Sequence, residues 1–358
     1  GNWVISKHYN PAMLAEAVEE YGRETGGAEL PRRHFIEWLA EWGREARRRQ
    51  SGLLLRLVDT LVAAGLTVAV IGLLQFVAGA SVVVAEGGSL RLASVYGSPN
   101  NAALFLERAL PFALVMVFAP FDRRRRVFGG LTAFIMLGAL ALTLSAGALF
   151  LGVPAAVALV LVLQYGKRGF LALAALAVLL GGALVVALQS ERFARLADFS
   201  AGTSFFRVRV WQSAVRMIAD HPVTGIGLDQ FLYQYRGQYI APDAWQEPDL
   251  SHPHNLVLDF WLRLGLLGAL LVLAVQAAFW VRSFRIWRMA GRDSLVRRAL
   301  VIGAMGSMIG LTVHGLVDNS VFVNDLAIVF MVLLAIPASL PIAREAAEEA
   351  PVPTPDTL

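Results

Sequence analysis

The 358-residue sequence contains no cysteine, which excludes disulfides, thiolate metal ligands and cysteine nucleophiles. Charged residues are also scarce, at 16%, against about 25% in soluble globular chains. Hydrophobic residues make up 57% of the chain and the mean hydropathy is +0.59, which places it among membrane proteins. The net charge of +4 and the pI near 9.7 could indicate a nucleic-acid partner. In a polytopic protein, however, excess arginine more often marks the cytoplasmic loops, so no nucleic acid is expected.

Long apolar runs dominate the rest of the sequence. Eight of them come close to the length that a helix needs to cross a bilayer, which predicts an all-α polytopic membrane protein with about eight transmembrane helices. The predicted spans are 53–79, 102–119, 127–145, 148–165, 169–189, 256–281, 297–317 and 322–342. Basic residues gather in the loops on one side, at Arg44 to Arg49, Arg123 to Arg126, Lys167 with Arg168, and Arg282 to Arg298. The positive-inside rule assigns that side to the cytoplasm.

The remaining segments are more polar. We expect residues 1–52 to form an amphipathic cytoplasmic extension on the membrane surface. The alternative is a remnant of a longer N-terminal half, since the chain starts at Gly1 rather than Met. Spans one to five fill 53–189 and include an outer loop at 80–101, and spans six to eight fill 256–342. A large outer loop, 190–255, separates the two groups, and 343–358 is predicted to be a disordered cytoplasmic tail.

The large outer loop holds most of the polar chemistry. Thr203 or Ser204 can cap a helix that runs to about Asp220, where His221 and Pro222 end it. Gly225 and Gly227 then predict a tight turn rather than a phosphate loop, because no strand precedes them. The next aromatic residues could stack on sugar rings or anchor the loop at the membrane interface. They are Phe231, Tyr233, Tyr235 and Tyr239.

A polar turn, Ser251 to Asn255, runs directly into span six and places His254 where water meets lipid. An imidazole has an ordinary pKa near 6.5, which suits a general base at neutral pH. His252, two residues earlier, is expected to point the other way in an extended turn. His314 and Asp318 share one helix face at the outer end of span seven and could support His254 through a hydrogen bond.

Two adjacent charged residues, Glu107 and Arg108, lie in the outer half of span two. They could face a cavity that receives a lipid carrier, or form structural ion pairs with Arg263 or Asp259. The sequence leaves both interpretations open.

Four motifs together resemble the O-antigen ligase family, whose bacterial members move lipid-linked glycans on the periplasmic face of the membrane. In the first, nine residues separate His254-Asn255 from Gly265-Leu-Leu-Gly268. The other three motifs are Arg207-x-x-x-Trp211 with the turn from Asp220 to Phe231, the segment Arg91 to Asn101, and His314 to Asp318. Members of the family usually carry about a dozen spans, so the first several are absent here or replaced by residues 1–52.

The resemblance implies a glycosyltransferase-C-like enzyme that is inverting, needs no cofactor and no metal, and lies in the bacterial inner membrane. Its donor would be a glycan on undecaprenyl pyrophosphate and its acceptor a glycan, lipid or protein. His254 would act as general base, with Asn255 orienting it or the acceptor. Arginines grip phosphate oxygens with two parallel hydrogen bonds. The substrate-binding residues are therefore expected to be Arg207, Arg91, Asn100, His314, Asp318 and Arg209.

Two other functions remain open. A polysaccharide polymerase of the same superfamily differs from a ligase only in its acceptor. A transporter of lipid-linked glycans would show internal repeats and broken spans with charges at the midplane. The sequence shows no evident repeat and collects its polar residues at the outer interface, which favours the enzyme.

Overall fold

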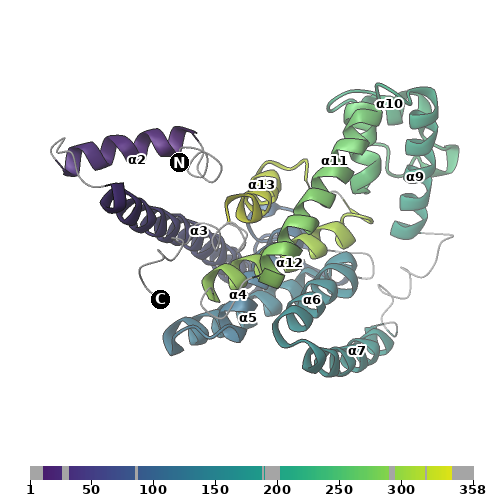
Figure 1. The fold of residues 1–358 in the computed structure, drawn as a ribbon. Coiled ribbons are helices and arrows are strands. Elements are labelled where there is room, and N and C mark those ends of the chain that lie inside the picture. The colour runs from purple at the N-terminus through teal and green to yellow at the C-terminus, as the bar shows by residue number, and fades with distance from the viewer. Residues whose placement is uncertain are drawn as a thin grey trace.

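The computed structural model describes residues 11–25, 32–84, 88–187, 189, 202–289, 295–318 and 321–340. For 11–17, 32–37, 39–51 and part of 176–187 the description is limited to the backbone. The predicted tail 343–358 and the stretch 190–201 of the large loop lie outside these residues. Figure 1 shows the described part as a bundle of long helices with a smaller helical unit, α9 and α10, beside α11 at one end.

The bundle is built from helices that overlap the predicted spans, although the first of them already begins at Arg32, inside the predicted extension 1–52. These are α3 (Arg32–Val77), α4 (Pro99–Phe118), α5 (Arg123–Thr143), α6 (Val153–Tyr165), α7 (Lys167–Ala187), α11 (Leu256–Met289), α12 (Leu295–His314) and α13 (Asn324–Ser339), preceded by α2 (Pro11–Glu24). In the described residues, six segments are long and apolar enough to cross a membrane: 52–77, 99–118, 123–143, 147–165, 256–289 and 295–314. A multi-span helical protein is therefore confirmed, whereas the number of eight spans stays a prediction.

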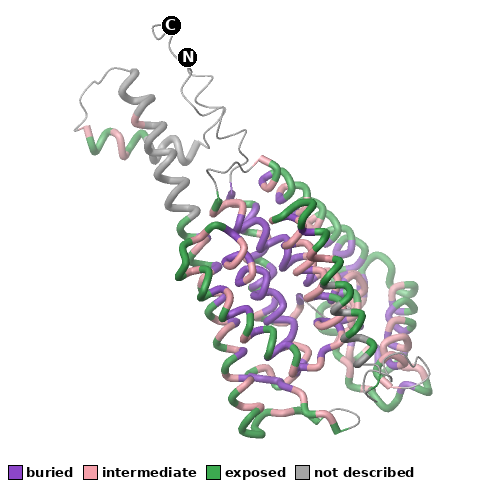
Figure 2. Tube along the Cα trace, turned by 90° about the horizontal axis from the view of Figure 1, so that it is seen from below, coloured by how far each residue is buried: buried purple, intermediate pink, exposed green. Residues whose placement is uncertain are grey.

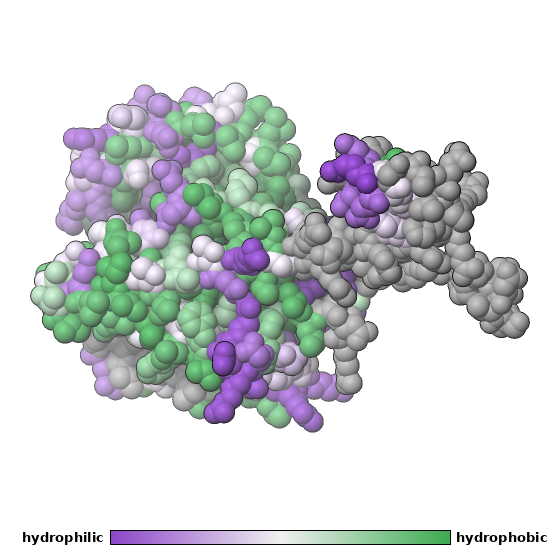
Figure 3. All heavy atoms as spheres, turned by 90° about the vertical axis from the view of Figure 1, so that its left-hand side faces the viewer, coloured by the Kyte–Doolittle hydropathy of each residue, from purple (hydrophilic) through white to green (hydrophobic). Residues whose placement is uncertain are grey.

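Helix α4 lies at the centre of the bundle. It begins cleanly because Ser98 caps it by accepting a hydrogen bond from the Asn101 amide (3.5 Å) and Pro99 opens its first turn. It packs against α3, α5, α6 and α12, and most of its side chains are buried. Figure 2 shows the buried residues concentrated in the interior of the bundle, and Figure 3 shows a broad apolar area over the middle of one face.

Arginines tie the helices together at one end of the bundle. Arg125 of α5 pairs with Asp59 of α3. Arg298 of α12 donates to the Leu163 carbonyl of α6 at 3.1 Å, and Arg282 of α11 donates to the carbonyls of Pro337 (2.5 Å) and Leu340 (2.9 Å). Cations beside the carbonyls that end a helix are favoured by the helix dipole. These predicted cytoplasmic arginines therefore share one end of the bundle.

The outer loop 80–101 contains a short hairpin, which the expectation of purely helical structure missed. Strand β1 (Val82–Val84) pairs antiparallel with β2 (Leu90–Leu92), with Val83 opposite Arg91. A single turn of 3-10 helix (Ser94–Tyr96) then leads into α4. Three consecutive β-branched valines favour a strand, and this was the local signal.

The described part of the predicted large outer loop, residues 202–255, is called the outer segment. It packs around a small hydrophobic core that also includes Leu262 of α11. Helix α9 (Gly202–Asp220) begins one residue before the expected cap at Thr203 and ends at the predicted His221 and Pro222. Helix α10 (Phe231–Gln234) and a π-helical turn (Tyr235–Tyr239) pack on it. Phe231, Tyr235 and Tyr239 are buried in this core, so for them both sugar stacking and membrane anchoring were wrong. Tyr233 alone of the four aromatics is exposed.

The outer segment is fastened to a break in α11. Gly265 interrupts this helix with φ 70° and ψ −166°, a conformation that a side chain would strain. The backbone groups that lose their helical hydrogen bonds at this break bond to the outer segment instead. The Leu266 amide donates to Val223 O (3.1 Å), and the Ile226 amide donates to Leu262 O (2.7 Å). The turn at Gly225 and Gly227 is confirmed, with φ values of 64° and 95°. The Gly265-Leu-Leu-Gly268 motif therefore marks where the outer segment docks.

Close helix packing at α4 gives a testable stability difference between two glycines of α5. A Cβ on Gly129 would lie 2.6 Å from Met116 Cβ and 2.9 Å from Ala113 O, whereas one on Gly138 would meet nothing within 4 Å. Gly129→Ala should lower the Tm in detergent, because overpacking costs about 1–3 kcal/mol. The matched Gly138→Ala should leave it unchanged or raise it, since alanine favours a helix by about 1 kcal/mol. Equal Tm values for the two variants would contradict this packing.

Candidate active site

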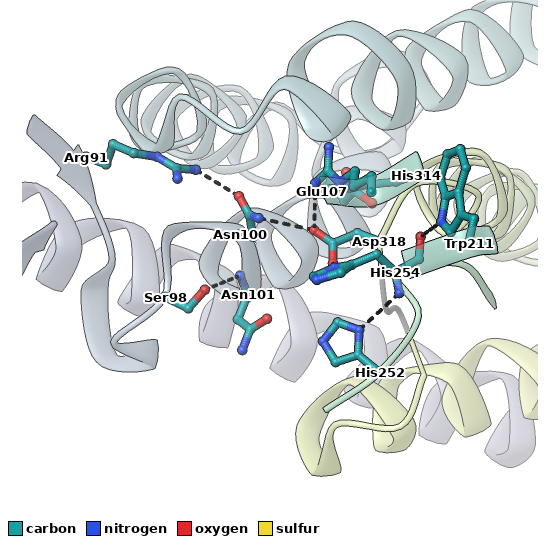
Figure 4. Close-up of polar contacts among 11 residues, drawn as sticks. Arg91, Ser98, Asn100, Asn101, Glu107, Trp211, His252, His254, His314 and Asp318 are labelled. Atoms are coloured by element: carbon teal, nitrogen blue, oxygen red, sulfur yellow. Dashed lines mark hydrogen bonds and ion pairs between the residues drawn. The ribbon is translucent and has the colours of Figure 1, made fainter. Parts of the chain in front are cut away.

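The polar residues singled out in the sequence meet at the end of the bundle opposite the arginines. The hairpin and the start of α4 supply Arg91 and Asn100, and α9 supplies Arg207. The turn before α11 supplies His254, and the turn after α12 supplies Asp318. Figure 4 shows Arg91, Asn100, Asp318 and His254 as a continuous chain of side chains.

His254 is held in an unusual backbone conformation. Its φ of 49° lies in the left-handed region, which costs free energy in a residue other than glycine and recurs at functional sites. Its Nδ1 lies 2.9 Å from Asp318 Oδ1, and its carbonyl accepts a bond from Trp211 Nε1 (3.4 Å). A carboxylate accepts only, so Nδ1 carries the proton and Nε2 is left as the basic nitrogen.

Asp318 is the centre of the network. Asn100 Nδ2 donates to its Oδ2 at 3.2 Å, and Arg207 lies 3.7 Å from the same oxygen. Burial alone would raise the pKa of Asp318. The hydrogen bond from His254 and the positive charges of His254, His314 and Arg207 outweigh burial and hold the pKa below its usual range. Asp318 is therefore an ionised partner for His254, as expected, whereas His314, which was expected to share this role, contacts Glu107 instead.

The two arginines differ in how fully they are engaged. Arg91 donates from Nε to Thr143 O (2.7 Å) and from its terminal nitrogen to Asn100 Oδ1 (2.8 Å), so it fixes the end of α5 and the amide that reaches Asp318. Arg207 has only a long contact to Asp318, and its buried Nε finds no hydrogen-bond partner in the described part of the chain. Arg207 is the better placed of the two to receive an anion.

Asn255 has a structural role that the sequence interpretation did not foresee. Its Oδ1 accepts from the amides of Val257 and Leu258, both at 3.0 Å, which caps α11. Its Nδ2 donates to Leu316 O at 2.9 Å. The side chain therefore sets the position of His254 by joining the start of α11 to the end of α12.

Arg209 is not brought to this network. It faces the outer segment, where it bonds Asp243 Oδ2 at 2.5 Å and Gln212 Oε1 at 3.0 Å and lies over the Phe205 ring. Two residues along a helix point about 200° apart, so Arg207 and Arg209 cannot share a target.

His252 was expected to point away from His254, and this was wrong. The backbone amide of His254 donates to His252 Nδ1 (3.3 Å), and the two rings are 4.2 Å apart. Burial lowers the pKa of His252 to about 3, helped by the charges of His254, Arg263 and Arg207. His252 is thus a neutral acceptor that shapes the turn.

Glu107 pairs with His314, not with Arg263 as one interpretation of the sequence had it. Glu107 Oε2 lies 2.9 Å from His314 Nδ1, and both side chains are buried. Arg263 instead bonds Asp259 (2.8 Å) and Asp229 and lies over the Phe322 ring. Arg108 donates to the Leu326 carbonyl at 3.0 Å.

The donor atoms of His252, His254 and Asp318 lie within 4.8 Å of one another, a spacing that a metal ion could use. The chemistry around them disfavours a cation, because Arg207 already lies against the Asp318 carboxylate. We assign no metal to these residues.

Trp211 and Glu107 were named from the sequence without the contacts that they make, and the Thr143 carbonyl was missed altogether. The Thr143 carbonyl, the Trp211 indole and the Glu107 carboxylate each contact a predicted site residue. A charged residue inside a span was the available signal for Glu107. A backbone carbonyl carries no signal in the sequence, so Thr143 could not have been found.

The low pKa of His252 predicts a pH dependence of stability. The unfolded chain, with a pKa near 6.5 for this group, binds its proton over a range where the folded chain does not. Unfolding should therefore become easier as pH falls from about 6.5 towards 3. His252→Asn keeps an acceptor but does not titrate, so its Tm should fall less over this range. Parallel Tm profiles for both proteins in detergent would contradict the assignment.

Comparison with known proteins agrees with the motifs. The family model described as O-Antigen ligase matches residues 131–273, which run from α5 to the middle of α11 and include Arg207, Trp211 and His254. A search of curated proteins finds no match. The structure adds Arg91, Asn100 and Asp318, which lie outside the matched range, to the same cluster. The resemblance seen in the sequence is therefore confirmed over residues 131–273, which match the model of the O-antigen ligase family.

Proposed function

We propose that the protein is a membrane glycosyltransferase that moves a glycan from undecaprenyl pyrophosphate to an acceptor hydroxyl. The observation that carries the proposal is the contact of His254 Nδ1 with Asp318 (2.9 Å), with Arg207 beside the same carboxylate. A base and an anion-binding group are thus adjacent, as glycan transfer from a pyrophosphate requires.

The reaction follows from these groups. The acceptor hydroxyl gives its proton to Nε2 of His254 while its oxygen attacks the anomeric carbon. The bond from that carbon to the pyrophosphate oxygen breaks, and its electron pair leaves with the pyrophosphate. Asp318 stabilises the imidazolium that forms, as the carboxylate does in a Ser-His-Asp triad. A single displacement of this kind inverts the anomeric configuration.

Arg207 would meet the charge on the departing pyrophosphate, since its guanidinium stays protonated and hydrogen-bonds two phosphate oxygens at once. Arg91 would act mainly through Asn100, which it holds at 2.8 Å. The arginines thus supply the positive charge that a metal ion provides in other phosphate-transfer sites.

The arrangement of charge supports an outer-face site. Arg125, Arg282 and Arg298 lie at the end of the bundle opposite His254. By the positive-inside rule the arginine end would face the cytoplasm, which supports a site on the periplasmic side of the inner membrane. A lipid-linked glycan and its acceptor would meet there. A ligase and a polymerase would use the same groups and differ in the acceptor.

One observation favours transport instead. Transporters use interrupted spans and buried charges, and this chain has a break in α11 at Gly265 and a buried Glu107. The break, however, is filled by the backbone of Val223 and Ile226, so it holds the outer segment. Flipping of a lipid-linked glycan across liposomes without transfer would support the transporter.

Replacing His254 should abolish most transfer. His254→Ala in the purified full chain should lower kcat by about 10²–10⁴-fold, the contribution typical of a general base. The matched control is His221→Ala, an exposed histidine of the same outer segment, which should keep its activity. The assay follows transfer from an undecaprenyl-pyrophosphate-linked oligosaccharide.

Two outcomes would contradict the proposal. Undiminished transfer by His254→Ala would remove His254 as the base. Loss of transfer on adding a chelator would assign a cation to His252, His254 and Asp318 in place of the arginine mechanism.

Replacing Arg207 should weaken the donor selectively. A charged hydrogen bond contributes about 1.5–3 kcal/mol, so Arg207→Ala should raise the Kd for undecaprenyl pyrophosphate about 10–100-fold, and Arg207→Lys should recover only part of this. Arg236→Ala removes an exposed ion pair with Asp249 in the same segment and should bind like the unaltered protein. Equal weakening in both variants would indicate a general effect of surface charge.

A further inference from the structure

Two polar contacts join the central helix α4 to the end of α12. Asn100 and Glu107 are seven residues apart on α4, so they lie on one face two turns apart. Asn100 contacts Asp318 at 3.2 Å, and Glu107 contacts His314 at 2.9 Å. The first contact belongs to the candidate active site, whereas nothing so far uses the second.

The Glu107–His314 contact is buried where unpaired charge is costly. The exposed fractions are 0% for Glu107 and 1% for His314, inside two of the most enclosed helices of the bundle. A carboxylate in such a place must be paired and hydrogen-bonded, and such groups in membrane spans usually serve a function. His314 also ends α12, where the helix dipole favours a positive charge. The two residues therefore suit one another as a charge pair.

A neighbouring segment of the same polypeptide leaves room for the Glu107 and His314 side chains. A π-helical turn, Gly147–Gly152, runs past them. A Cβ on Gly147 would collide with His314 Nε2, and one on Gly152 would collide with Glu107 Oε2. Glycine at both ends of the turn leaves the space that the two side chains fill. Any larger residue at either position would push the pair apart.

The turn after His314 carries the contacts that set the position of His254. The Leu256 amide donates to Gly315 O (2.6 Å), and Asn255 Nδ2 donates to Leu316 O (2.9 Å). The amide of Asp318 donates back to His314 O at 3.1 Å. Whatever fixes His314 therefore fixes the turn that presents Asp318 to His254.

We propose that Glu107 and His314 form a positioning pair for the transfer reaction, which anchors the last turn of α12 to α4 so that Asp318 stays against His254. The inference rests on the proposed function. Glu107 and His314 act through Asp318 and touch neither substrate. Loss of the pair lets Asp318 move, and a displacement of about 1 Å at a reacting group can cost about 100-fold in rate. Donor binding through Arg207 is left intact.

The test uses the full chain in lipid nanodiscs with two variants of Glu107. Glu107→Leu removes the contact, whereas Glu107→Gln keeps an oxygen acceptor of the same size. Ser307→Ala is the matched control, because it deletes another buried hydrogen bond of α12, to Arg108 O at 2.9 Å, two turns from His314. We expect kcat to fall about 100-fold in Glu107→Leu, less in Glu107→Gln and not at all in Ser307→Ala, with the Kd for undecaprenyl pyrophosphate unchanged in all three.

A spectroscopic readout separates positioning from stability. The chain has six histidines, so ring-¹⁵N NMR with His→Gln assignments can follow the Nδ1–H of His254 that bonds Asp318. This signal should be lost in Glu107→Leu, shifted in Glu107→Gln and preserved in Ser307→Ala. The NMR measurement does not depend on activity, and Glu107→Gln keeps the test usable if the leucine variant fails to fold.

Each result decides the inference. Unchanged kcat and an unchanged His254 signal in Glu107→Gln and Glu107→Leu would overturn the positioning pair while His254→Ala still tests the proposed function. An equal fall of kcat in Ser307→Ala would also overturn it, because loss of packing would then explain the effect. Full transfer by His254→Ala would refute the proposed function itself, whatever Glu107 shows.

Discussion

The carboxylate of Asp318 is the group on which the rest of the site depends. Its two oxygens meet His254, Asn100 and Arg207, which come from three parts of the chain that are far apart in sequence. Because Asp318 is almost fully buried, its negative charge needs these partners, and they in turn are fixed by it. The carboxylate thus determines the tautomer of His254.

Contacts within the helix bundle fix the position of the Asp318 carboxylate. Helix α4 is enclosed by its neighbours. Its Glu107 contacts His314 at the end of α12, and its Asn100 contacts Asp318 in the turn that follows. Polar contacts inside a membrane have few competitors, since neither lipid nor water offers an alternative partner. The outer segment is secured differently, by backbone hydrogen bonds at the break in α11 and by a core of buried aromatics. Both attachments end beside His254.

Much of the fold could be predicted because membrane insertion is read directly from apolar length and arginine placement. The six described spans fall where apolar runs predicted them. The hairpin at Val82 to Leu92 and the break at Gly265 were missed, because short strands and kinks depend on neighbours. The sequence also predicted wrongly that His252 points away from His254. The left-handed φ of His254 turns the chain back on itself, and histidine is not a residue type from which such a φ is predicted.

Hydropathy and motifs alone indicated a helical membrane protein, six of its spans, the resemblance to O-antigen ligases and the site candidates, which are His254, Arg207, Arg91, Asn100 and Asp318. Which of these candidates contact one another became visible only in the folded protein. In the folded protein His254 contacts Asp318, and Arg209 contacts Asp243 instead of the site. Asn255 caps α11, and Glu107 pairs with His314. The reason is that hydropathy and motif spacing act along the chain, whereas these contacts join residues up to 218 positions apart and follow from how helices pack.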